Sequence, residues 1–223
     1  MTPERGTPGQ PKFPRLVLAT GNAAKLVELA RILKAERVDV ELADLGGFPG
    51  MPSVAETGAT FAENALLKAR AVAKFTNLPA VADDSGLCVD ALNGMPGVLS
   101  ARWSGGHGDD EANLRLVLGQ VADVPEERLG AHFACAAVLV LPSGAEHVSE
   151  GAVYGRLIRE PRGSGGFGYD PIFVPSATEL AHGGVAHADG LTTAQLAPEA
   201  KDAISHRGRA LRGLVPAIAA ALA

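Results

Sequence analysis

The chain has 223 residues, of which 47% are apolar, and it carries a formal net charge of -5. This length suits one large domain or two closely joined lobes with a sizeable core, and the apolar content excludes a disordered protein. The mildly acidic balance excludes the broad positive surface of a general DNA or RNA binder, although a nucleotide needs only one local positive site.

The first fourteen residues, MTPERGTPGQPKFP, contain proline and glycine but no apolar core. They predict a flexible tail over residues 1–14 rather than a signal peptide, followed by a single domain over residues 15–223. Cys88 and Cys135 each lie in an apolar run without the spacing of metal ligands, which indicates buried, reduced thiols. No apolar stretch is long enough to span a bilayer, so we expect a cytoplasmic protein.

In the first part of the chain, short apolar runs alternate with apolar residues at helical spacing. Thr60 and Glu63 form a capping-box pattern at the start of a helix. The predicted elements are a strand at 15–19, a helix at 23–35, a strand at 38–42, a loop at 44–59, a helix from 60 to about 75 and a strand at 79–82.

In the second part, Asp83 to Gly86 has the composition of a turn between two strands. Pro198 starts a last helix, which we expect Pro216 to kink. The other predicted elements are a strand at 87–92, a helix at 109–117, a hairpin of strands at 131–141 and 146–158, and a glycine-rich loop at 163–169. The order of elements predicts an α/β protein with a mixed sheet.

The first candidate site is a turn between a strand and a helix, formed by Thr20, Gly21 and Asn22, with Lys25 in the first helical turn. The first N–H groups of a helix have no partner within the helix and carry partial positive charge, so they can bind an anion. A lysine at this end opposes the helix dipole, which favours a role facing phosphate. The alternative is an ordinary connection with a solvated lysine.

The second candidate site is acidic. Asp83 and Asp84 follow a buried strand, and adjacent carboxylates repel each other unless a cation or hydrogen bonds compensate. Mg²⁺ prefers oxygen ligands, often one or two carboxylates together with phosphate oxygens. Glu56 could complete the cluster, and Lys68, which shares a helix face with Asn64, could reach a phosphate. A polar turn with a solvated lysine is the alternative.

The third candidate site is the loop from Gly163 to Pro171, which matches G-x-G-x-x-G. A dinucleotide-binding fingerprint needs a preceding strand and a following helix, and Tyr-Asp-Pro follows here instead. We therefore expect a pliable loop that presents Phe167 and Tyr169 as stacking surfaces, with Gly168 between them and Asp170 as an acceptor. The alternative is a structural loop with core aromatic residues.

The fourth candidate site is on the last predicted helix, where Lys201 and the run Ser205-His206-Arg207 place hydrogen-bond donors on one element. Lys201 and Ser205 are four residues apart and therefore share a helix face. Taken alone, this pattern favours a solvated charged face.

Together these segments resemble the Ham1/inosine triphosphate pyrophosphatase family. The resemblance covers about residues 16–211. It is carried by TGNAAK (20–25), ETGATFAENALLKA (56–69), ADDSGLCVDALNGMPGVLSARW (82–103), GGFGYDPIF (165–173) and KDAISHRGRAL (201–211).

The resemblance implies a long mixed sheet flanked by helices, with two lobes around a nucleotide cleft, in a homodimer that needs Mg²⁺. It implies hydrolysis of ITP, dITP and XTP to the monophosphate and pyrophosphate. Asp84 would be the proton acceptor, within an acidic metal site. By matching motifs, the implied metal ligands are Glu56, Asp83 and Asp84; the phosphate-binding residues are Thr20, Gly21, Asn22, Lys25 and Lys68; and the nucleoside-binding residues are Ser85, Phe167, Gly168, Tyr169, Asp170, Lys201, His206 and Arg207.

The chain departs from the family pattern in a longer N-terminal tail, an enlarged stretch at 178–191, and Gln195 where the family has Glu. Two other functions fit parts of the pattern. A nucleotide sensor would keep the phosphate and aromatic loops but would not need all three acids. A pyrophosphatase for pyrimidine or methylated nucleotides is less consistent with the Ser-His-Arg segment. No nucleic acid polymer or membrane is expected as a partner.

Overall fold

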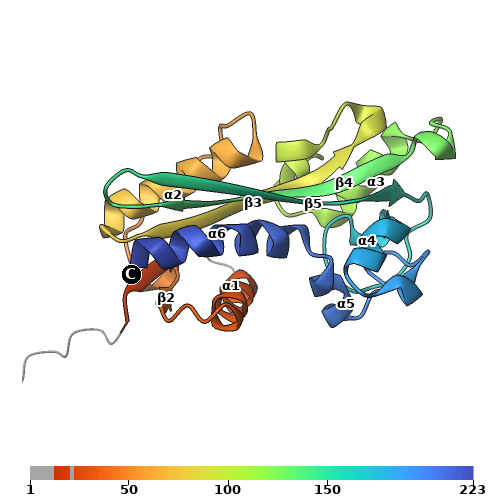
Figure 1. The fold of residues 1–223 in the computed structure, drawn as a ribbon. Coiled ribbons are helices and arrows are strands. Elements are labelled where there is room, and N and C mark those ends of the chain that lie inside the picture. The colour runs from red at the N-terminus through yellow and green to blue at the C-terminus, as the bar shows by residue number, and fades with distance from the viewer. Residues whose placement is uncertain (1–12, 21–22, 223) are drawn as a thin grey trace, which may run out of the picture.

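The computed structural model describes residues 13–20 and 23–222, which form a mixed sheet with helices on both faces (Figure 1). The strand order across the sheet is β2-β1-β3-β4-β5-β6. β1 is parallel to β2 and β3, whereas β3 to β6 form an antiparallel meander. The predicted α/β class is therefore confirmed. The strands are β1 Arg15–Leu18, β2 Glu41–Ala43, β3 Ala80–Val89, β4 Gly130–Val140, β5 Glu146–Leu157 and β6 Phe173–Pro175.

Several helices begin where a side chain satisfies one of their first N–H groups. Thr60 accepts from the N–H of Glu63 at the start of α2, and Asp109 accepts from that of Ala112 at the start of α3. The predicted caps at these two positions are confirmed. The α-helices are α1 Ala23–Ala35, α2 Phe61–Thr76, α3 Asp110–Gln120, α4 Ala177–His182, α5 Pro198–Ala203 and α6 His206–Leu222.

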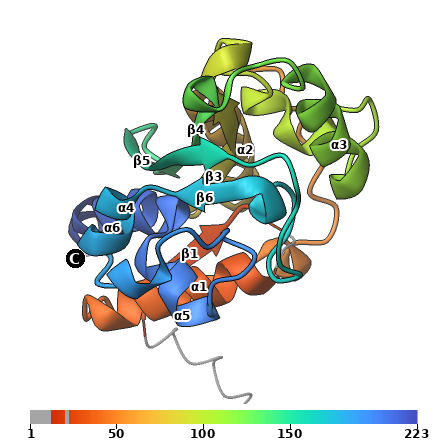
Figure 2. The ribbon, with the colours of Figure 1, turned by 90° about the vertical axis from the view of Figure 1, so that its right-hand side faces the viewer.

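The sheet separates two layers of helices, and the view along the strands shows both (Figure 2). Helix α2 packs on one face, where its small side chains meet the even-numbered residues of β3. Helices α1 and α6 cover the other face, where they bury Val81 of β3 together with odd-numbered residues of β4. A third apolar cluster fills the end of the sheet that carries α3, α4 and α5. The long strands β3 to β5 thus join the three parts of the core.

The segment Asp83–Gly86, predicted as a turn, lies inside one continuous strand. β3 runs from Ala80 to Val89 and pairs with β4 along its whole length, including Asp83 with Ala137 and Gly86 with Ala134. The turn prediction was wrong because this long-range pairing satisfies the backbone of residues whose local preference is for turns. As a consequence, successive side chains from Asp83 onward point to opposite faces of the sheet.

The predicted last helix is also different, because it is divided into α5 and α6 at Ile204 and Ser205. The hydroxyl of Ser205 accepts from the N–H of Gly208 at 3.0 Å, which makes Ser205 the cap of α6. Helix α6 runs through Pro216 to Leu222. β6 and α4 were not predicted, because they are too short for a periodic signal, and β2 begins three residues later and ends one residue later than predicted.

Most of the predicted tail at 1–14, together with Gly21 and Asn22, lies outside the described residues. Among the helices that the structure describes, none is long and apolar enough to cross a membrane. Both cysteines are free and buried, as predicted.

Candidate active site

Asp83 and Asp84, adjacent in the chain, belong to two different clusters. Asp83 faces α1 and α6, whereas Asp84 faces α2. The predicted grouping of both acids with Glu56 around one point is therefore replaced by two sites on opposite faces of the sheet. The physical reason is the alternation of side chains along a continuous strand.

On the face of α1 and α6, the Asp83 carboxylate joins two cations. Lys25 Nζ lies 3.0 and 2.8 Å from its two oxygens, and Arg207 Nε donates to Oδ2 at 2.9 Å. Arg207 also donates to Ser85 Oγ at 3.1 Å. Burial by itself would raise the pKa of Asp83, but Lys25 and Arg207 outweigh it and hold the pKa at about 2. Asp83 thus binds both Lys25, which was expected to bind phosphate, and Arg207, which was expected to bind the nucleoside.

Glu28 on α1 extends this cluster, although the sequence reading gave it no role. Its carboxylate lies 3.9 Å from Arg207 and accepts from the Ser205 hydroxyl at 3.4 Å. Burial raises the pKa of Glu28, with Arg207 acting in the opposite direction. The helical spacing between Lys25 and Glu28 was the available signal, because residues three apart share a helix face.

On the opposite face, Lys68 of α2 stands between two carboxylates. Its Nζ lies 2.9 Å from Glu56 Oε1 and 3.6 Å from Asp84 Oδ1. Asn64 of the same helix donates to Asp84 Oδ2 at 3.1 Å, and Arg102 contacts Glu56 at 3.4 Å. From the sequence, Lys68 was predicted to bind phosphate and Asn64 was noted only as sharing its helix face. Arg102 was assigned no role, although it lies in one of the quoted motifs.

The pKa values of Asp84 and Glu56, the two acids of this second cluster, are shifted in opposite directions. Burial raises the pKa of Asp84, and the neighbouring Glu56 adds to the rise. Burial also pushes the pKa of Glu56 upward, but Lys68 and Arg102 outweigh it and the pKa is lowered. Asp84 therefore has a greater proton affinity than an ordinary aspartate, which is the property required of a base that must take up a proton.

The glycine-rich loop presents one aromatic ring rather than two. Phe167 is 67% exposed and has Lys201 Nζ 5.2 Å from its ring centroid. Tyr169 is only 4% exposed, and its hydroxyl donates to the carbonyl of Ser100 at 2.8 Å. Tyr169 is therefore a buried residue that anchors the loop to Ser100. The expectation that Tyr169 offers a stacking surface was wrong.

Asp170 is buried beneath the same loop and is used within the protein. Its carboxylate accepts from the N–H of Phe167 at 2.8 Å, from the Thr193 hydroxyl at 2.8 Å and from Lys201. The N–H of Gly168 is bound at 2.8 Å by Asp110 of α3, a contact that the sequence did not indicate. Asp170 thus sets the shape of the loop that carries Phe167.

His206 begins α6 and lies against β4. Its ring stacks on Phe133 with centroids 5.2 Å apart and planes 12° apart. Burial first, and then the nearby Arg207 and Lys201, lower the pKa of His206 to about 3. The imidazole is therefore neutral at neutral pH and has one N–H donor and one acceptor.

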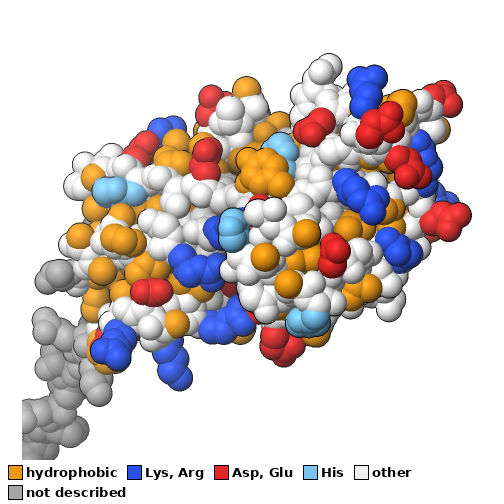
Figure 3. Space-filling model, turned by 45° about the vertical axis from the view of Figure 1, so that its right-hand side comes forward, with side chains coloured by type: hydrophobic (Ala, Val, Ile, Leu, Met, Phe, Trp, Pro, Cys, Tyr) orange, Lys and Arg blue, Asp and Glu red, His pale blue; other side chains and the backbone are white. Residues whose placement is uncertain are grey.

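Of the predicted phosphate residues, Lys25 and Lys68 lie on opposite faces of β3, and Thr20 is half-buried directly after β1. Gly21 and Asn22 fall outside the described residues. Within the part of the chain that the structure describes, no three His, Cys, Asp or Glu side chains converge to hold a metal ion. The space-filling view shows acidic and basic groups interspersed, without a broad patch of one sign on that face (Figure 3).

A protein-family model of the Ham1 family matches residues 16–217, most of the chain. The chain belongs to the Ham1 family. Similar Ham1 relatives include the dITP/XTP pyrophosphatase of Streptomyces coelicolor, 55% identical over 92% of this chain and 96% of that protein. The dITP/XTP pyrophosphatase of Nocardia farcinica is 56% identical over 92% of this chain and 95% of that protein.

Two solved structures agree with this assignment. The nucleoside-triphosphatase, or dITP/XTP pyrophosphatase, of Mycobacterium abscessus is 53% identical with a TM-score of 0.75, covering 92% of this chain and 99% of that chain. A HAM1 protein from Coxiella burnetii is 39% identical with a TM-score of 0.80, covering 92% and 98%. The fold and the family are thus supported by both sequence and structure.

Proposed function

We propose that the chain hydrolyses the non-standard purine nucleoside triphosphates ITP, dITP and XTP to the monophosphate and pyrophosphate. Relatives named dITP/XTP pyrophosphatase, identical at more than half of the aligned positions over 92% of the chain, support the substrate class. The observation that carries the reaction is the placement of Asp84, a half-buried acid of raised pKa, beside Glu56 and Lys68.

Asp84 acts as the proton acceptor in this proposal. It takes the proton of a water molecule that attacks the α-phosphorus, the bond to the bridging oxygen breaks, and pyrophosphate leaves. Phosphoryl chemistry of this kind depends mostly on positioning and charge neutralisation. Lys25 and Lys68 supply positive charge for the phosphate groups, together with Thr20, Gly21 and Asn22 at the start of α1.

The residues present also suit Mg²⁺. Glu56 and Asp84 both lie on one side of the sheet and supply the hard oxygen ligands that Mg²⁺ prefers. When bound, the ion neutralises phosphate charge and lowers the pKa of water. Asp83 was expected as a third ligand, but its oxygens face Lys25 and Arg207. We therefore propose Glu56 and Asp84 as the metal ligands and Asp83 as the residue that orients the two cations.

Arg207, His206, Lys201 and Ser85 are proposed to bind the nucleoside, with Phe167 to Asp170 forming the loop against it. Hypoxanthine and xanthine carry a 6-oxo acceptor, whereas adenine has a 6-amino donor that would face the guanidinium donor to donor. Such a mismatch leaves buried polar groups unpaired, at a cost of about 1–3 kcal/mol. Guanine must be rejected through its additional 2-amino group.

We also propose that residues 15–223 form one pyrophosphatase domain of two lobes. The protein acts in the cytoplasm as a homodimer on a small-molecule nucleotide, without a nucleic acid polymer as partner.

The reaction is tested by identifying products. Purified protein with Mg²⁺ should convert ITP to IMP and pyrophosphate in one step, and chelation of the metal should abolish turnover. IDP and orthophosphate as products would mean attack at the γ-phosphorus and would contradict the proposal. Asp84→Asn should lower kcat by roughly 10²–10⁴-fold. The control is Asp90→Asn, which removes an exposed acid just beyond the end of the same strand.

A further inference from the structure

Along part of the outer edge of β5, side chains rather than a neighbouring strand form hydrogen bonds to the backbone. β6 pairs only with Gly155–Leu157, and the N–H of Ser176 then donates to the carbonyl of Tyr154 at 2.9 Å. Beyond that point the N–H of Tyr154 donates to Glu179 Oε1 at 3.2 Å, and the carbonyl of Ala152 accepts from Arg209 at 2.6 Å. Glu179 and Arg209 therefore take the places that a longer β6 would occupy.

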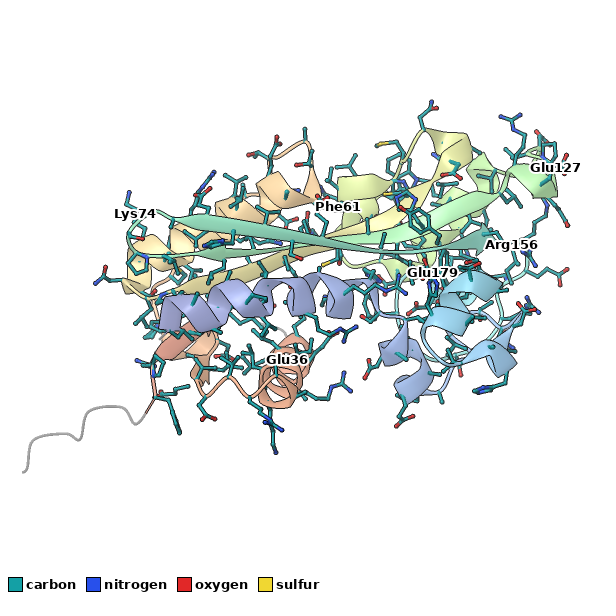
Figure 4. The ribbon with its side chains drawn as sticks, viewed as in Figure 1. Glu36, Phe61, Lys74, Glu127, Arg156 and Glu179 are labelled. Atoms are coloured by element: carbon teal, nitrogen blue, oxygen red, sulfur yellow. The ribbon has the colours of Figure 1, made fainter. Side chains whose placement is uncertain are left out.

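These two side chains also bind each other. Arg209 donates to Glu179 Oε2 at 2.6 Å, and the Glu179 side chain is only 9% exposed. Figure 4 marks Glu179 where α4 meets the sheet near the start of α6. The pair thus joins three elements, because Glu179 belongs to α4, Arg209 belongs to α6, and both bind the backbone of β5.

The same part of α6 lies unusually close to β5. A Cβ added to Gly151 would lie 2.3 Å from the carbonyl oxygen of His206 and 2.7 Å from the N–H nitrogen of Ala210. The first turns of α6 therefore rest directly on the strand, and only glycine permits this approach. Arg209 is the charged anchor of these turns, two residues beyond Arg207.

We infer that the Arg209–Glu179 pair is a positioning device that fixes the first turn of α6, so that Arg207 and His206 read the purine base. This inference rests on the proposed base-reading role of Arg207 and His206. Loss of the pair would let the first turn shift on β5 and would weaken discrimination between bases. The metal-side residues Glu56, Asp84 and Lys68 lie on the other face of the sheet and would keep their geometry.

The ion pair between Arg70 and Glu146 is a matched control for the Arg209–Glu179 pair. Arg70 of α2 binds Glu146, the first residue of β5, through two hydrogen bonds of 2.6 and 2.8 Å. This pair likewise joins a helix to β5 through an ion pair, but it stands at the opposite end of the strand from Tyr154. Its removal should leave α6 in place.

The test compares kcat/KM for ITP and for ATP in Arg209→Met, Glu179→Ala and the control Arg70→Met, with Arg207→Ala as the positive control. We expect the ITP-to-ATP ratio to fall about tenfold in Arg209→Met and Glu179→Ala, because small misplacements of binding groups cost one to two orders of magnitude. The loss should lie mainly in KM for ITP. Arg70→Met should keep the native ratio.

The ratio separates positioning from general stability. A purely structural role would reduce the folded fraction and lower both activities by the same factor, leaving the ratio unchanged, and that result would overturn the inference. If Arg209→Met does not fold, Arg209→Lys carries the same test, since it keeps the charge but loses the planar fork whose two nitrogens reach the Ala152 carbonyl and Glu179 separately. An unchanged ratio in Arg209→Lys then overturns the inference.

Amide hydrogen exchange of residues 206–210 gives a readout without substrate. Exchange should be faster in Arg209→Met, or in Arg209→Lys, and unchanged in Arg70→Met. If the native protein showed no preference for ITP, the proposed function would fail, and the exchange result would still show whether the pair holds α6. Unchanged exchange in the Arg209 variants would contradict the inference whatever the substrate.

Discussion

Asp83 and Asp84 are adjacent aspartates whose pKa values are shifted in opposite directions. Asp83 is held at a pKa of about 2 because two cations outweigh its burial, whereas burial raises the pKa of Asp84. Asp83 is therefore a fixed negative charge that orients Lys25 and Arg207. Asp84 retains more proton affinity, and this difference supports Asp84 rather than Asp83 as the base.

Asn64→Ala should move the acid limb of the kcat/KM profile to higher pH. The amide of Asn64 donates to the Asp84 carboxylate and so lowers its pKa, and without this hydrogen bond the pKa should rise further. A base works only when deprotonated, so activity is present above this pKa and lost below it. Initial rates with ITP across the acid range would measure the shift.

The control is Asn113→Ala. Asn113 is a buried residue whose side-chain amide oxygen accepts from the N–H of Ser104, in a loop, at 2.7 Å. It has no contact with Asp84. The acid limb of this variant should stay in place. If the acid limb of the kcat/KM profile stayed in place or moved to lower pH in Asn64→Ala, a group other than Asp84 would be responsible for it.

Among the elements, α6 depends most on close contact with the sheet. Its first turns rest on Gly151 of β5, and its last turns pack with α1 on the core beneath β1. Ser205 caps α6 and separates it from α5, so that His206 and Arg207 stand in the first turn. A single uninterrupted helix, as expected from the sequence, would place these residues in its interior.

Gly151→Ala should destabilise the fold by about 1–3 kcal/mol or more, because the new methyl group would meet the α6 backbone. Backbone atoms cannot move aside as a flexible side chain can. Urea unfolding measures the change in free energy. Gly119→Ala on α3 is the matched control: a methyl group there has no atom within 4 Å, and we expect a gain of up to about 1 kcal/mol. Equal stability of both variants would contradict the close approach.

At the level of the whole molecule, Asp83 connects segments that are far apart in the sequence. Through Lys25 and Arg207 it links α1 near the N-terminus to α6 near the C-terminus across the central strand β3. The same contacts join the proposed phosphate and base sites. The contacts between α1, β3 and α6 therefore depend on one buried carboxylate, and under the proposed function substrate binding depends on it too.

Asp83→Asn should lower the free energy of unfolding by about 3 kcal/mol at neutral pH, because it leaves Lys25 and Arg207 without their partner. The native pKa of about 2 is below the ordinary value of 3.8, so the stabilisation is present above about pH 4 and is lost as the pH falls toward 2. The variant should lack this part of the acid dependence. Urea unfolding at a series of pH values measures both effects.

Asp202→Asn is the control for this prediction. Asp202 pairs with Arg31, but the two side chains are 42% and 58% exposed, so its loss should cost at most about 1 kcal/mol. A similar cost for both variants would mean that Asp83 is not the buried link described here.

The sequence by itself determined the family, the α/β class, the two helix caps and most of the residues proposed for the site. These features depend on local chemistry, such as a capping threonine, an apolar strand or a specific motif, and local chemistry is readable along the chain. It also indicated correctly that both cysteines are buried.

Only the tertiary structure decided which of these residues meet. Pairing of β3 with β4 turned an expected loop into a strand and sent Asp83 and Asp84 to opposite faces. The contacts of Arg102, Asp110 and the Glu179–Arg209 pair cross between separate elements, and no local pattern encodes them. The physical reason is that a side chain's direction and partners are set by strand register and helix packing, which join residues distant in sequence.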